Sequence, residues 1–224
     1  MNRIFRILPA AALLAVTVFG AAGSPAAAAR PCPPNPPPGS TIIGDIVLVN
    51  FQNCTLANVT VTGSITGGKD SGLTLQNATV LHGLNVTDEQ IFIINSTIDG
   101  NVSPTARFLD ICGSHLNGAV LLTGGGTTGL PYRIGDPGEA IPSGPSDCPG
   151  NTINGSLTVN DAENIEIEGN HIVGTNALTL NGFSGEFAGN TIHGNATCTS
   201  DTFTAIDADS NAPNTYSGTD NGCP

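Results

Sequence analysis

One short unit recurs along the chain and constrains its fold more than any other feature. A Gly repeats with successive gaps of 19, 20, 17, 18, 37, 19 and 20 residues, at Gly44, Gly63, Gly83, Gly100, Gly118, Gly155, Gly174 and Gly194. Five residues earlier, or six before Gly83, stands only Gly or Asn: Gly39, Asn58, Asn77, Asn95, Gly113, Gly150, Gly169 and Gly189. Gly and Asn adopt the left-handed backbone region most easily, so this column predicts one tight turn per repeat. The gap of 37 is about two periods, which predicts one further repeat that lacks the motif.

Alternating apolar and polar residues flank each predicted turn. An aliphatic residue stands two positions before nearly every recurring Gly, and a Thr or His precedes that residue, as in Thr152-Ile153 and His171-Ile172. Such alternation in short runs is typical of half-buried strands. A repeat of strands and turns alone, with a period near 20 residues, indicates stacked coils that bury a shared core. We predict an all-β fold, a single-stranded parallel β-helix of about eight to nine coils with disulfide-stapled ends, over residues 40–224.

The first 29 residues have the composition of a secretory signal peptide. Arg3 and Arg6 precede an apolar run from Leu8 to Gly20, and small residues before Arg30 offer a cleavage site. The apolar run is shorter than the roughly 20 residues that a membrane-spanning helix needs. Residues 30–39 form a Pro-rich leader, for which polyproline II is the expected conformation. The sequence therefore predicts a secreted protein, extracellular or associated with the cell envelope, with no membrane span.

Six cysteines in a secreted chain predict three disulfides. Sequence alone allows 15 connectivities, but the placement favours local pairs: Cys32 with Cys54, Cys112 with Cys148, and Cys198 with Cys223. These pairs would hold the first coil, an interruption of the repeat, and a C-terminal cap at 198–224. The interruption spans 123–150 and is rich in Gly and Pro. We expect it to be a loop insertion and a binding surface, with Tyr132 and Arg133 as the candidate binding residues.

The charge balance excludes some partners. The chain holds 18 acidic residues against 6 Lys and Arg, a formal net charge of −12. Binding to nucleic acid needs a basic surface, so nucleic acid is not an expected partner. An extracellular or envelope polysaccharide stays open as a partner. We expect a monomer rather than a filament.

Acidic side chains are the candidates for catalysis. Secreted parallel β-helices include polysaccharide lyases and glycosidases, and a glycosidase needs two carboxylates beside the scissile bond. Glu166 and Glu168 lie in the densest acidic stretch and would share the outer face of one strand, about 6–7 Å apart. The chain has no Trp and two Tyr, so it has few aromatic platforms for sugars. We therefore prefer a non-enzymatic function.

Two groups of residues raise the question of a metal. Asp207, Asp209 and Asn211 match the opening of a calcium loop, but Ala212 and Gly218 stand where that loop needs Gly and Glu. A weakly bound Ca²⁺ is the one cofactor left open. His115 and His171 occupy one outward column, but at least two coil rises separate them, too far to share an ion. The Thr residues of the same column resemble the surface of some ice-binding proteins, although the two His interrupt it.

Several of these repeats resemble a known group of proteins. Asn95-Ser96-Thr97-Ile98-Asp99-Gly100-Asn101-Val102 and Gly189-Asn190-Thr191-Ile192-His193-Gly194-Asn195, with Cys198, Asn211-Ala212-Pro213 and Cys223, look like secreted actinobacterial β-helix proteins of the GNxVGGN repeat type. The rhythm is also similar to pectin-lyase-like and bactofilin-like solenoids. The resemblance implies a fold and a compartment, and no catalytic residue. We therefore expect a non-enzymatic secreted structural or binding protein of the cell envelope or extracellular space; the alternative is a carbohydrate-active enzyme or polysaccharide-binding protein of pectin-lyase-like type.

Overall fold

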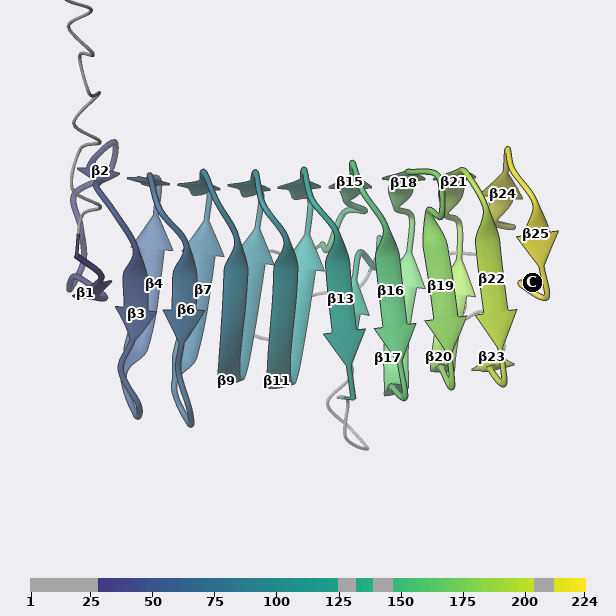
Figure 1. Cartoon of the computed structure of the whole chain (residues 1–224), viewed down its shortest axis with the longest axis horizontal. Helices are drawn as coiled ribbons and strands as arrows, with labels where there is room; N and C mark the ends of the chain where they lie inside the picture. Colours follow the sequence, from purple (N-terminus) through teal and green to yellow (C-terminus); the bar gives the residue numbers. More distant parts are fainter. Residues whose placement is uncertain (1–27, 125–131, 139–146, 204–211) are drawn as a thin grey trace, which may run out of the picture.

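The structure is a computed structural model that describes residues 28–124, 132–138, 147–203 and 212–224. It confirms the predicted fold class, because all regular elements of these residues are strands and the strands stack in parallel into a solenoid of about eight turns (Figure 1). The predicted signal peptide lies almost wholly outside the described residues and stays a prediction. No helix in the described part is long and apolar enough to cross a membrane.

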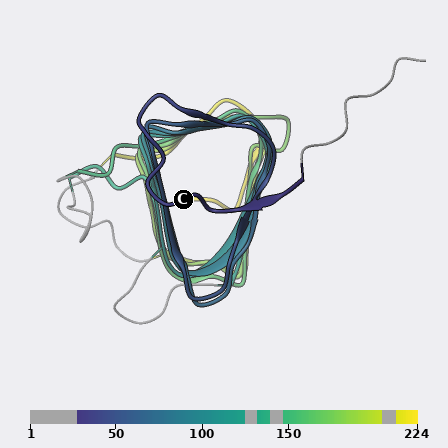
Figure 2. The same ribbon diagram turned by 90° about the vertical axis from the view of Figure 1, so that its left-hand side faces the viewer.

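Each coil has three sides, which Figure 2 shows as a triangular outline when the solenoid is seen along its axis. We call them the front, back and top walls. The top wall is a nine-stranded sheet of very short strands. In chain order it contains β2 (Thr41–Ile42), β5 (Thr60–Val61), β8 (Thr79–Val80), β10 (Thr97–Ile98), β12 (His115–Leu116), β15 (Thr152–Ile153), β18 (His171–Val173), β21 (Thr191–His193) and β24 (Thr215–Tyr216).

The front and back walls together form one sheet of 16 strands. The front wall contains β1 (Arg30–Pro31), β3 (Ile46–Leu48), β6 (Ile65–Gly67), β9 (Leu84–Ile94), β11 (Val102–Cys112), β13 (Val120–Thr123), β16 (Leu157–Asn160), β19 (Leu178–Asn181), β22 (Ala196–Thr199) and β25 (Asp220–Asn221). The back wall contains β4 (Asn53–Ala57), β7 (Gly72–Gln76), β14 (Tyr132–Ile134), β17 (Glu163–Glu168), β20 (Ser184–Ala188) and β23 (Thr202–Phe203). β9 and β11 continue from the front wall into the back wall, where they pair with β7 and β14.

The turn column behaves as predicted at seven of its eight positions. Gly39, Asn58, Asn77, Asn95, Gly113, Gly169 and Gly189 have φ angles between +48° and +77°. The aliphatic residues beside them point inward and form one continuous core along the solenoid. Because each inward side chain stacks on its register partner in the next coil, the core requires every coil to keep the same alignment.

The gap of 37 residues does not hold a second coil, so the prediction of a further repeat there is wrong. β12 pairs directly with β15, and β13 pairs directly with β16. A single enlarged coil therefore spans the gap. Its extra residues fall between β13 and β14 and between β14 and β15.

The three disulfides join Cys32 to Cys54, Cys112 to Cys148, and Cys198 to Cys223. These are the local pairs that the cysteine placement favoured. The first fixes the leader against the first coil, where β1 pairs with β3. The last holds the C-terminus against the final coil, where the Tyr216 hydroxyl donates to the carbonyl of Pro224 at 2.8 Å. Three disulfides indicate an oxidising environment.

Candidate functional site

Between β14 and β15 the enlarged coil leaves the regular path of the solenoid. We call this segment the excursion, and it begins at the corner that follows β14. Gly135 adopts a φ of +67° there. Gly150, at the expected turn position, does not have a positive φ. The backbone N–H of Asp136 donates to the carbonyl of Cys148 at 2.8 Å, in an antiparallel bridge that closes the excursion. The disulfide from Cys148 to Cys112 ties the excursion to β11. Part of the outer face of the back wall is therefore covered rather than exposed.

A small apolar cluster lies on the outer face beside this excursion. Phe92, Ile94 and Phe108 come from β9 and β11, and they pack with the Cys112–Cys148 disulfide. The rings of Phe92 and Phe108 have centroids 5.3 Å apart in a tilted arrangement. Each of these residues is at least nine-tenths buried. The chain thus builds a second core outside its sheet, separate from the core inside the solenoid.

Arg133 forms the centre of a buried ionic cluster next to this apolar cluster. The Nε–H of Arg133 donates to Glu166 Oε2 on β17 at 2.8 Å, and the same nitrogen lies 3.3 Å from Asp136 Oδ2. Arg133, Asp136 and Glu168 are all buried on the outer side. One arginine therefore joins β14 and β17 and the start of the excursion.

Asp110 lies next to Arg133 in the register of the back wall and is fully buried. Neither of its carboxylate oxygens has a hydrogen-bond partner among the described residues. Burial raises the pKa of Asp110 to about 7; the charge of Arg133 lowers this pKa and the charge of Glu166 raises it. A carboxyl group that loses water in this way favours its neutral form.

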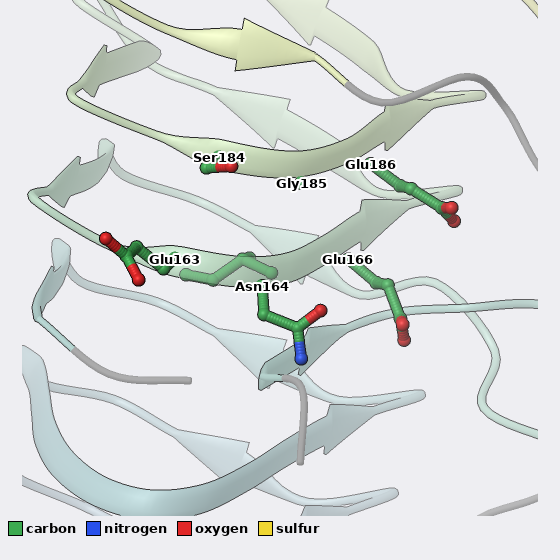
Figure 3. A pocket seen from close by; sticks show the side chains of 7 residues that line it. Glu163, Asn164, Glu166, Ser184, Gly185 and Glu186 are labelled. Carbon is green, nitrogen blue, oxygen red and sulfur yellow. The ribbon is translucent and has the colours of Figure 1, made fainter. Parts of the chain in front are cut away.

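A shallow groove of about 330 Å³ continues from the ionic cluster over β17 and β20. It is lined by Glu163, Asn164, Ile165, Glu166, Ser184, Gly185 and Glu186. Figure 3 shows Glu166 and Glu186 side by side on adjacent strands, with Glu163 at the opposite end of the groove. Three carboxylates, one amide and one hydroxyl offer mainly hydrogen-bond acceptors, so the groove suits a ligand that carries donors or positive charge.

A β-bulge shapes the floor of this groove. The register between β17 and β20 shifts between Glu163 and Ile165, and the additional residue, Asn164, has a φ of +54°. Opposite the bulge, a Cβ added to Gly185 would collide with the carbonyl oxygen of Ile165. Bulges re-aim side chains and are over-represented near functional sites. Here the bulge separates the carboxylate of Glu163 from that of Glu166.

The two candidate carboxylates, Glu166 and Glu168, are not exposed together on the outer face. Glu166 is partly exposed in the groove, but Glu168 is buried at the end of β17, so a substrate cannot reach both. Strand parity places both outward, as expected, but Glu168 is buried where Pro137 of the enlarged coil packs beside the following residue, Gly169. Glu186, the register partner of Glu166 on β20, takes the place of Glu168 beside the open groove.

Tyr132 and Arg133 are also not residues of an exposed binding loop. Both belong to β14, which lies inside the predicted insertion of 123–150. Tyr132 points into the main core, and its hydroxyl exchanges hydrogen bonds with the backbone of Ala106. Burial raises the pKa of the Tyr132 phenol. Both side chains therefore fix the enlarged coil to its neighbours.

The predicted calcium ligands Asp207, Asp209 and Asn211 lie outside the described residues. In the part of the chain that is described, no group of three or more His, Cys, Asp or Glu side chains could hold a metal ion. Glu163 belongs to the acidic stretch that the sequence singled out around Glu166. Sequence reasoning missed Asp110, Asp136 and Glu186 as neighbours of that stretch. Of the three missed residues, Asp110 carried a signal, because it is the charged residue of an otherwise apolar run, Phe108-Leu109-Asp110-Ile111.

No protein-family model, curated protein or solved structure matches this chain. The groove is therefore interpreted from its own residues.

Proposed function

We propose that this chain is a non-enzymatic, secreted binding protein of the extracellular space or the cell envelope, and that its groove on β17 and β20 binds a hydroxyl-rich polysaccharide. The observation that carries the proposal is the change of the outer face at this groove. The register column of Glu166 and Glu186 begins with Thr55, Thr74 and Phe92 and continues through Asp110 and Arg133. Asp110 and Arg133 are buried, whereas Glu166 and Glu186 line the groove. Carboxylate and amide oxygens accept hydrogen bonds from sugar hydroxyls, and the straight stack of coils extends along the same direction as a linear polymer.

Three disulfides support the oxidising compartment that secretion implies. The resemblance to secreted actinobacterial β-helix proteins of the GNxVGGN type agrees with this compartment. Disulfides near both ends of the solenoid, Cys32–Cys54 and Cys198–Cys223, favour a monomer over end-to-end assembly, because they restrain the terminal coils.

Binding can be tested by affinity gel electrophoresis of the protein in a panel of neutral, amino-sugar and acidic polysaccharides. We expect retardation by at least one polysaccharide and its loss in the double variant Glu163→Gln/Glu186→Gln. The matched control is Asp70→Asn/Asp99→Asn, which removes the same charge far from the groove. Equal retardation of both double variants, or no retardation of the unmodified protein by any polymer, would contradict the proposed site or the proposed ligand class.

A carbohydrate-active enzyme is the second candidate, and the pairing of Glu166 with Glu186 favours it. Register partners on adjacent parallel strands lie roughly 4.8 Å apart. Retaining glycosidases hold their two carboxyl groups about 5–5.5 Å apart. This candidate predicts release of reducing ends from the polysaccharide that binds, and loss of that release in Glu186→Gln. Binding without any release of reducing ends would leave the non-enzymatic proposal standing alone.

A further inference from the structure

Two histidines from consecutive coils lie in contact on the outer side of the top wall. His171 lies on β18 and His193 on β21, and their ring centroids are 4.8 Å apart with planes tilted by 60°. The register explains the meeting: His171 lies opposite Thr191 and Val173 lies opposite His193, so the two histidines are diagonal neighbours on the same face. Both side chains are exposed to solvent.

The position of His193 is fixed from a third coil. Its Nδ1 lies 3.2 Å from the hydroxyl oxygen of Ser217, which follows β24. A hydrogen bond at one ring nitrogen orients the imidazole and leaves the other nitrogen, Nε2, for a ligand. Ser217 therefore restrains the His193 ring on its Nδ1 side.

The separation of the rings agrees with joint coordination of one ion. With metal–nitrogen distances of about 2.0–2.1 Å and N–metal–N angles between square-planar and tetrahedral values, two ligating imidazoles have centroids roughly 4.5–5.2 Å apart. The measured 4.8 Å falls inside this interval. Little rearrangement beyond ring rotation is then needed to close the chelate.

We propose that His171 and His193 form a surface site for a borderline divalent transition cation, with water completing the coordination shell. Imidazole nitrogens suit Cu²⁺, Ni²⁺ and Zn²⁺, and the Irving–Williams order places Cu²⁺ first among them. The formal net charge of −12 attracts cations to this surface in general. The site lies on the top wall and the polysaccharide groove on the back wall, so the two proposals are independent.

The structure supplies a matched control in His115. This histidine occupies the same outward column as His171, but its register partners are Thr97 and Thr152. Its side chain is therefore exposed on the same wall, as that of His171 is, without a second imidazole among its register partners. A contribution from isolated surface histidines would be equal at His115 and His171.

The test is isothermal titration of the full chain with CuCl₂ and with ZnCl₂, in a buffer that does not coordinate metals. We expect one strong Cu²⁺ site per chain that weakens on the order of tenfold or more in His171→Asn and in His193→Asn, and by a smaller factor in Ser217→Ala. His115→Asn should bind as the unmodified protein does. Zn²⁺ should occupy the same site more weakly.

Electron paramagnetic resonance of the Cu²⁺ complex gives a second readout, because the nitrogen hyperfine pattern of two equatorial imidazoles differs from that of one. Far-UV circular dichroism checks that each variant keeps the solenoid. The proposal is overturned if the unmodified protein binds no Cu²⁺, if His115→Asn weakens binding as much as His171→Asn, or if the nitrogen signal is unchanged in His193→Asn.

Discussion

The enlarged coil and its regular neighbours share an interior and differ on the outside. Inside, Leu116 lies between Ile98 and Ile153 in the top wall as if no residues had been added. On the outer face, the regular coils present exposed or half-exposed polar residues such as Thr74. In the enlarged coil Arg133 is buried instead, and so is Asp110 in the coil before it.

The difference shows which part of this fold tolerates change. A shift of one residue would turn every inward side chain outward, so the core and the backbone ladder fix the register of each coil. Extra residues can leave only at the corners, where the chain does so between β13 and β14 and between β14 and β15. The corner excursions then alter the outer face, and the candidate groove begins at their border.

Loss of Arg133 should produce the largest difference between the two regions. Arg133→Met would leave Glu166 and Asp136 without this buried cationic partner. Breaking a buried ion pair from one side costs about 3–5 kcal/mol of the free energy of unfolding. The exposed Arg107 is the matched control, and Arg107→Met should change stability by about 0.5 kcal/mol or less. Urea unfolding followed by circular dichroism measures both variants; similar losses would show that the enlarged coil has no special dependence on buried charge.

The disulfides offer the next contrast. Cys112 and Cys148 are separated by 36 positions in the sequence. Removal of their disulfide in Cys112→Ala/Cys148→Ala should lower the free energy of unfolding by about 3–4 kcal/mol. It should also expose the outer cluster of Phe92 and Phe108, which binding of a hydrophobic dye would report. Cys198→Ala/Cys223→Ala should loosen only the last coil, because solenoid ends fray without unfolding the rest. More dye binding by the terminal variant would reverse this assignment.

Asp110 should make the free energy of unfolding depend on pH, whereas the exposed acids of the regular coils should not. Its folded-state pKa of about 7 is above the ordinary value of 3.8, so between these values the folded protein keeps a proton that the unfolded chain has lost. Its contribution to stability is therefore complete at low pH and decreases as the pH rises toward 7. Between pH 4.5 and 7.5 the decrease amounts to about 3 kcal/mol.

The variant Asp110→Asn should remove this part of the pH dependence. Relative to the unmodified protein, it should gain about 3 kcal/mol of stability between pH 4.5 and pH 7.5, measured by urea unfolding at both values. Asp99→Asn, at an exposed acid of a regular coil, is the control and should follow the unmodified protein. A pH-independent difference for Asp110→Asn would mean that Asp110 does not titrate in this interval.

The solenoid could be predicted from the sequence because each repeat carries residues that its backbone turn and its core positions require. Gly or Asn at the turn and aliphatic residues at fixed offsets each have a local reason, and the local pairing of Cys32 with Cys54 follows from their proximity. The groove had no such signal. Glu166 and Glu186 are 20 residues apart and meet only through the register. Burial of Glu168 depends on the path of the enlarged coil, which strand parity does not contain.

Sequence reasoning also missed a column of buried polar residues at the corner that directly follows the turn column, because these residues had no assigned role. We call this column the corner ladder. Ser96 and Ser114 occupy this corner before the enlarged coil, and Asn151, Asn170 and Asn190 occupy it afterwards. The Ser96 hydroxyl donates to the carbonyl of Ile94 in its own coil at 2.8 Å. The Ser114 hydroxyl lies 3.0 Å from the carbonyl oxygen of Cys112 in its own coil and 3.1 Å from that of Ile93 in the preceding coil, so its single proton is shared between the two coils. The longer asparagine amide reaches a carbonyl of the preceding coil, as Asn151 does to Ile111 at 2.7 Å.

Replacement of these ladder residues gives the smallest predicted effect. Asn170→Ala removes the acceptor of the Asn151 backbone N–H and the donor to the carbonyl of Ile134, both buried, and should cost about 2 kcal/mol of the free energy of unfolding. Ser96→Ala removes the acceptor of the Ala78 N–H and a bond within its own coil, and should cost about 1 kcal/mol. Amide hydrogen exchange locates the damage: the Asn151 N–H should lose protection in Asn170→Ala, because that bond joins two coils. If Ser96→Ala cost as much as Asn170→Ala, the bond from the Asn170 amide to the carbonyl of Ile134 would add nothing to stability beyond what Ser96 provides within its own coil.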